Sequence, residues 1–113
     1  MMALDKEIVT RVCAQLTKYL LERSAESLNI SITKAKKYYE VRIVSKVFLK
    51  DEELNLLKSY LNVQPQEVGY YYLPLIGEYG SEEDLAIIAM LLKELDLNYD
   101  ESSHELVISF RVR

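Results

Sequence analysis

The sequence predicts an α+β fold in which about three helices pack on one side of a small, mostly antiparallel sheet. Apolar residues recur at helical spacing in residues 4–28, 51–62 and 81–95, and they alternate in steps of two in residues 39–43 and 106–112. With 113 residues, half of them apolar, the chain is long enough to bury one core. We expect a single α+β domain over residues 1–113, with the order α-β-α-β-α-β-β and a C-terminal β-hairpin.

Residues 4–28 are expected to form the first helix. No Pro or Gly interrupts this segment, and its apolar residues recur every three or four positions. Asn29 is the predicted stop, because asparagine tolerates the left-handed conformation better than most residues. The apolar stripe comprises Leu4, Ile8, Val12, Leu16 and Tyr19.

Residues 38–49 fit two patterns. Tyr39, Val41 and Ile43 alternate with charged residues, which is typical of a half-buried strand, although Ile43, Val44, Val47 and Phe48 also form a helical stripe. The β-branched content favours a strand. Ile30 and Ile32, which alternate just before a basic turn over residues 34–37, offer it an antiparallel partner.

The second half predicts the remaining elements. Asp51 is the expected N-cap of a helix through residue 62, and Ser81 begins a capping-box-like start to a helix that continues to Leu95. Residues 67–73 form a candidate strand that Pro74 ends or confines to a sheet edge. The last two strands, at residues 97–99 and 106–112, are predicted to form the C-terminal hairpin.

Residues 25–39 also resemble the helix-turn-helix pattern of bacterial and archaeal DNA-binding proteins. The resemblance implies that Thr33, Lys34, Lys36 and Lys37 face the DNA groove or its phosphates. The other interpretation is that one helix ends at Asn29 and that a basic turn leads into a sheet. Ala25, Leu28, Asn29, Ile30, Ser31 and Ala35 occupy the positions that the pattern requires.

Charge is unevenly distributed along the chain. Residues 1–50 hold ten Lys/Arg against five Asp/Glu, whereas residues 51–113 hold four against thirteen, which gives the net charge of −4. A basic half suggests a polyanionic partner. The leading hypothesis is therefore a non-enzymatic nucleic-acid-associated or regulatory protein, with phosphate contacts from Lys34, Lys36, Lys37 and Arg42.

The C-terminal half of the chain suggests an interface between two copies. An apolar run of eight residues, 85–92, makes the predicted third helix apolar nearly all round. A homodimer is expected, and the alternative function is a protein–protein interaction module or homodimeric structural module with no nucleic-acid role. The candidate interface residues are Tyr70, Tyr71, Tyr72, Ile87, Met90 and Leu91.

No set of residues predicts catalysis, a cofactor or a metal. His104 is the single histidine and lies in a polar turn, where a solvated loop side chain is expected, and Cys13 is expected to be a packed thiol. The single cysteine, the absence of a signal-peptide pattern and the shortness of the apolar run predict an intracellular, cytoplasmic protein that does not enter membranes.

Overall fold

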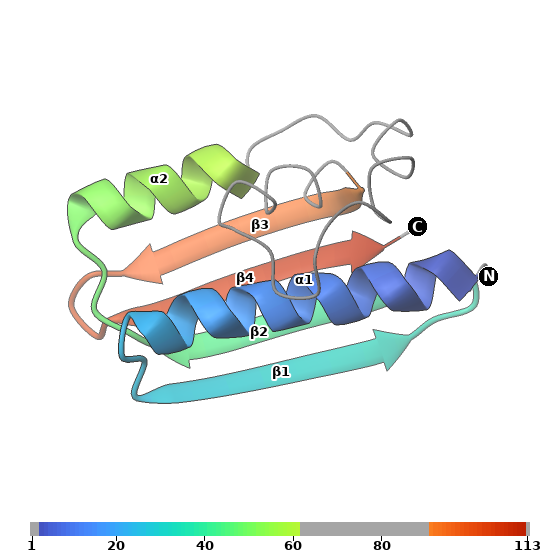
Figure 1. Cartoon of the computed structure of the whole chain (residues 1–113), viewed down its shortest axis with the longest axis horizontal. Coiled ribbons are helices and arrows are strands. Elements are labelled where there is room, and N and C mark those ends of the chain that lie inside the picture. Colours follow the sequence, from blue (N-terminus) through green and yellow to red (C-terminus); the bar gives the residue numbers. More distant parts are fainter. Residues whose placement is uncertain (1–2, 62–90, 113) are drawn as a thin grey trace.

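The computed structural model describes residues 3–61 and 91–112, which form two helices and four strands in the order α1-β1-β2-α2-β3-β4 (Figure 1). The expected α+β class and the mostly antiparallel sheet are confirmed. The bounds are α1 Ala3–Glu22, β1 Ser27–Lys34, β2 Tyr39–Lys46, α2 Asp51–Leu61, β3 Leu92–Asp100 and β4 Glu105–Val112.

The four strands form one antiparallel sheet in the order β1-β2-β4-β3. Ile43 on β2 lies opposite Ile30 on β1 and Ile108 on β4, so the strands share a register in which side chains of one parity face the same way. Every second residue of β2 and β4 is buried. One face of the central strands is therefore the core face, and the opposite face carries mainly polar side chains, together with the paired Val44 and Val107.

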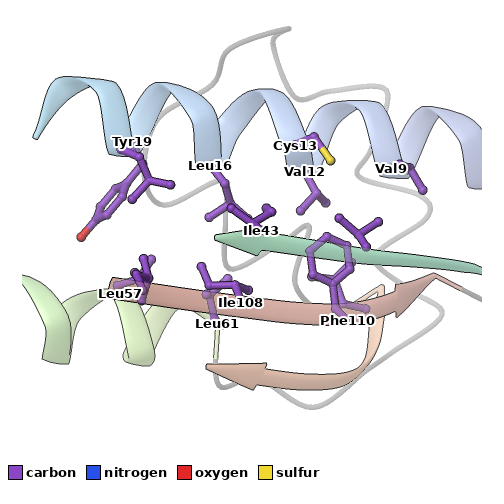
Figure 2. Close-up of a cluster of buried hydrophobic side chains, with 14 of the residues drawn as sticks. Val9, Val12, Cys13, Leu16, Tyr19, Ile43, Leu57, Leu61, Ile108 and Phe110 are labelled. Carbon is purple, nitrogen blue, oxygen red and sulfur yellow. The ribbon is translucent and has the colours of Figure 1, made fainter. Parts of the chain in front are cut away.

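Both helices cover the core face of the sheet (Figures 1 and 2). Val12 and Leu16 on α1 and Leu57 on α2 join the buried side chains of β2 and β4 in one cluster, and each is at most 1% exposed. Burying side chains of this size contributes roughly 1.5–3 kcal/mol each relative to leaving them in water. This single cluster holds the helices on the sheet.

Polar contacts join the C-terminal end of α1 to α2. The Arg23 guanidinium lies 3.6 Å above the Tyr19 ring centre and pairs with the Glu53 carboxylate at 3.1 Å, while the Tyr19 hydroxyl donates to the Glu53 carbonyl at 3.3 Å. The second carboxylate oxygen of Glu53 accepts the Lys50 backbone N–H at 3.1 Å, which is half of a capping box. Because the Lys50 carbonyl also accepts the first helical bond from the Leu54 N–H, Lys50 is the N-cap, and the prediction of Asp51 in that role is wrong.

The first helix ends earlier than the sequence predicts. Ser24 adopts a left-handed conformation, with φ of 60°, and donates to the Leu21 carbonyl, while Ala25 donates to the Leu20 carbonyl. These two bonds form a Schellman motif with serine in place of the usual glycine. The predicted stop at Asn29 is therefore wrong, because Asn29 already lies in β1.

The helix-turn-helix interpretation of residues 25–39 is wrong as well. Ser27–Lys34 is strand β1, and it pairs with β2 along its whole length. The β-branched residues of both strands suit a pleated surface, and ladder hydrogen bonds outweigh the short pattern of small and capping residues that resembled a helix pair. The interpretation of Tyr39–Lys46 as a strand, with an antiparallel partner at Ile30 and Ile32, is confirmed.

The C-terminal hairpin is confirmed, but its first strand begins earlier than expected. Leu92 and Leu95 were predicted at the end of a helix, and they lie in β3, where Leu92 pairs with Val112 of β4. A register shift between Lys93 and Asp96 marks a bulge, which disguised the alternation. The predicted strand at residues 67–73, and the third helix up to residue 90, lie outside the described residues.

Replacing Ile43 with Ala tests the core cluster. Ile43 is 0% exposed, so its truncation should lower the free energy of unfolding by about 2–5 kcal/mol. Leu56→Ala is the matched control on α2, because Leu56 is 43% exposed and its truncation should cost less than about 1 kcal/mol. Urea unfolding measures both, and equal losses would contradict the assignment of the core face.

Candidate functional site

The face of the sheet opposite the helices carries a shallow polar hollow of about 350 Å³. Its lining comes from all four strands, because side chains of the outward parity converge there. Two guanidinium groups, three hydroxyl groups and two carboxylates belong to the residues that line it. The polar lining residues are Ser31, Thr33, Glu40, Arg42, Glu94, Ser109 and Arg111.

Arg111 is the fixed cation of this hollow. Its guanidinium pairs with the Glu94 carboxylate at 3.4 Å and lies 4.7 Å from the centre of the Tyr38 ring. Glu94 has φ of 52°, a left-handed conformation that costs a residue with a Cβ roughly 1–2 kcal/mol, and it sits in the bulge of β3. The bulge thus places a carboxylate against Arg111, whose Nε is buried and makes no hydrogen bond with the described residues.

The basic residues predicted from the sequence gather at one end of the sheet. Lys36 and Lys37 lie in the loop between β1 and β2, which is closed by the Ala35 N–H donating to the Tyr38 carbonyl at 2.9 Å, and both are exposed. Lys34, at the end of β1, is exposed too and stands opposite Tyr39, on the helix side. Within residues 3–61 and 91–112 no carboxylate pairs with these lysines.

Thr33 and Arg42 differ from the lysines in their placement. Thr33 is opposite Glu40, and Arg42 is opposite Ser31 on one side and Ser109 on the other, so both belong to the polar hollow. Arg42 and Arg111 are diagonal neighbours on adjacent strands, a separation of roughly 7–8 Å between Cα atoms. The structure therefore divides the five predicted residues between a lysine loop and an adjoining arginine hollow.

The other end of the sheet is acidic. Asp100, Glu101 and Glu105 are all exposed at the β3–β4 turn. Hydrogen bonds from the Ser102 hydroxyl and N–H, at 2.6 and 2.9 Å, lower the pKa of Asp100, so this carboxylate is charged at neutral pH. The sheet thus has a basic end and an acidic end.

Most of the predicted interface residues lie outside the described residues: Tyr70, Tyr71, Tyr72, Ile87 and Met90. Leu91 is described and is 3% exposed, because it belongs to the core of a single chain. Its side chain therefore offers little surface to a second copy.

His104 is held more firmly than its polar turn suggests. Its ring lies 5.2 Å from the Phe48 ring, and its Nδ1 is 3.3 Å from the Tyr99 hydroxyl. That hydroxyl donates to the Val47 carbonyl at 2.9 Å and accepts the Leu49 N–H at 3.0 Å. These contacts hold the segment between β2 and α2 against the hairpin. The expected solvated side chain is therefore corrected to a half-buried one.

Two other expectations concern chemistry and membranes. Cys13 is 9% exposed within the core, which agrees with a packed thiol, and no group of three or more potential metal-binding side chains occurs among the described residues. In the described part of the chain, neither helix is both long enough and apolar enough to cross a bilayer.

Tyr99→Phe tests the pinning role of the tyrosine. Removing the hydroxyl leaves the Leu49 N–H and the Val47 carbonyl without their partner, which should lower the free energy of unfolding by about 1–3 kcal/mol. Tyr60→Phe is the matched control, because this ring also packs against the core and its hydroxyl has no partner within the described residues. Equal stability of the two variants in urea unfolding would contradict the role.

The Cys13 thiol provides a pH-dependent test. Burial raises its pKa from 9.0 to about 11, so the folded state favours the neutral thiol. Its contribution to stability should be complete below pH 9 and be lost as pH rises from 9 to 11, where the unfolded thiol ionises first. Iodoacetamide labelling should reach half its maximal rate near pH 11 in the native protein and near pH 9 in urea. Coincident midpoints would contradict the buried thiol.

Comparison of the chain with protein-family models, curated proteins and solved structures finds no match. The arrangement of charge, exposure and strand geometry described above is thus what bears on function. Its most distinctive feature is the basic end of the sheet, where an exposed lysine loop adjoins a hollow with two arginines.

Proposed function

We propose that the protein is a non-enzymatic, nucleic-acid-associated or regulatory protein that binds phosphate groups through the basic end of its sheet. The observation that carries this proposal is the grouping of Lys34, Lys36 and Lys37 at one loop, all exposed and without a described carboxylate partner. Three lysines within four residues concentrate positive charge on one loop, and such a concentration attracts a polyanion.

The adjoining hollow supports the same proposal. Arg42 is exposed beside Ser31 and Ser109, and guanidinium and hydroxyl groups are common donors to phosphate oxygens. Arg111 is already paired with Glu94, so it serves better as a source of positive potential than as a direct ligand. Lys36 and Lys37 then make the first contacts, and Arg42 extends the contact surface along β2.

The alternative is a protein-interaction module with no nucleic-acid role. The acidic end of the sheet favours it, because Asp100, Glu101 and Glu105 form an exposed group that would attract a basic partner. The two functions differ in the end of the sheet that binds, so they respond to different substitutions.

The test replaces Lys34, Lys36 and Lys37 together with Gln. Wild-type binding to a labelled duplex and a labelled single strand, followed by fluorescence anisotropy, should weaken steeply as salt increases, and the triple variant should lower the slope of log K against log[salt] by about 2–3. Phosphate contacts of this kind release condensed counterions, which is the cause of the slope.

The matched control replaces Lys6, Lys50 and Lys58 with Gln. This variant has the same net charge as the first, but its three exposed positions are scattered over α1, α2 and the segment before α2. It should keep the wild-type slope. The proposal is wrong if the wild type binds neither nucleic acid at low salt, or if both variants lose the slope equally.

A further inference from the structure

Among the described strands, β1 has one partner and one open edge. It pairs with β2 on one side, and it stands at the end of the strand order β1-β2-β4-β3. We propose that this open edge pairs antiparallel with β1 of a second copy of the chain, about a two-fold axis at Ile30, so that two four-stranded sheets become one. This inference concerns the self-association of the chain and does not depend on nucleic-acid binding.

The composition of β1 leaves its edge unprotected. Between Ser27 and Thr33 the strand has no charge and no proline, and its pairing with β2 continues without a register shift. Ile30 and Ile32 are 37% and 51% exposed, which is unusual for isoleucine beside a core. A long, regular, apolar edge of this kind is a template for a further strand.

The opposite edge of the same sheet, strand β3, differs from β1 because it is protected against the addition of a further strand. Strand β3 carries Lys93, Glu94 and Asp96 within four residues, and a bulge interrupts its ladder there. Charges and bulges are the usual means of preventing strand addition. Because β3 has both and residues 27–33 of β1 have neither, pairing through β1 closes the assembly at two copies, whereas pairing through both edges would continue into a filament.

The backbone of β1 sets which residues can pair. The Ala35 N–H bonds to the Tyr38 carbonyl, and bonding alternates along an antiparallel ladder, so the odd-numbered residues of β1 bond to β2. The even-numbered residues Leu28, Ile30, Ile32 and Lys34 then direct their N–H and C=O groups to the open edge. These are also the residues whose side chains face the helix side.

The edge is self-complementary in one register. With Ile30 opposite Ile30 of the second copy, Leu28 lies opposite Ile32, and Glu26 lies opposite Lys34 of the other chain. Glu26 precedes the strand, its N–H bonds to the Lys46 carbonyl at 2.8 Å, and its carboxylate pairs with the Lys46 ammonium of its own chain at 3.6 Å. Because both side chains of that pair are more than half exposed, the Glu26 carboxylate can exchange Lys46 for Lys34 of the second copy. Cross-strand pairs of apolar residues and of opposite charges each stabilise an antiparallel ladder.

This self-complementary pattern identifies the strand that pairs with the open edge as β1 of a second copy of the chain. An acid before the strand, apolar residues within it and a base at its end give the same pattern when the strand is turned end to end. A shift by two residues, with Ser31 on the axis, would place Leu28 opposite Lys34 and leave Glu26 opposite Lys36 in the loop. The register with Ile30 on the axis therefore joins apolar with apolar and acid with base throughout.

The first experiment measures the oligomeric state by sedimentation velocity over a range of concentrations. The wild type should dimerise, and Ile30→Lys and Ile30→Glu should each weaken the dimer on the order of a hundredfold, because like charges meet at the axis. An equimolar mixture of the two variants should recover the dimer. Leu21→Lys is the control, because Leu21 is 59% exposed on α1, away from the edge, and this variant should dimerise like the wild type.

The second experiment tests the register by oxidative cross-linking. A pair of residues that share ladder bonds has Cα atoms about 5.5 Å apart, within the range of a disulfide, so Ile30→Cys should cross-link two chains. In the same register Ile32→Cys meets Leu28, not itself, and should remain uncross-linked. The buried Cys13 thiol, with its raised pKa, should not take part.

Several results would overturn the proposal. These are a wild type that stays monomeric at all concentrations, a dimer that survives both charged Ile30 variants, and cross-linking at position 32 rather than 30. Concentration-dependent growth beyond two copies would show that β3 pairs as well, and a monomer that captures extended foreign peptides at β1 would show a different occupant; either would also overturn it. Circular dichroism of every variant shows whether the fold is intact.

Discussion

The alternation of side chains along β2 and β4 is the constraint on which the rest of the structure depends. These central strands bury every second residue against α1 and α2, so the intervening residues must face the other way. A slip of one residue in either strand would place Arg42 or Arg111 in the core and Ile43 or Ile108 in water. The polar hollow and the core cluster therefore both depend on the same strand register, and a change of that register would disrupt both.

Three residues other than glycine adopt a left-handed conformation, two of them in connections between elements and one within β3. Ser24 turns the chain from α1 into β1, Glu94 forms the bulge of β3, and His104 closes the β3–β4 turn, where its N–H bonds to the Asp100 carbonyl at 2.7 Å. None of the three is glycine, so each carries a steric cost of roughly 1–2 kcal/mol. At Ser24 and His104 the backbone bonds offset part of that cost, and at Glu94 the ion pair with Arg111 does so.

The sequence predicted the elements whose periodicity is unbroken, and it failed where periodicity does not show a boundary. Tyr39–Lys46, α2 and the C-terminal hairpin follow from alternation or helical spacing. The stripe of the first helix gave no sign of its end at Glu22, because Leu28 falls at helical spacing by chance, and Leu92 and Leu95 misled in the same way. The basic residues of the candidate site were predictable, but the separation of Arg42 from the lysine loop, and the exposure of Ile30 and Ile32, depend on strand order, which composition does not contain.

The two ends of the sheet differ in sign, and they are joined by rigid strands. The lysine loop lies beyond one end, and Asp100, Glu101 and Glu105 lie at the other, a separation of about eight residues or roughly 26 Å. These two groups therefore present opposite charges at the two ends of the strands in the described part of the chain. A negatively charged surface would attract the lysine loop and repel these three carboxylates, so it would favour an approach in which the lysine loop comes first.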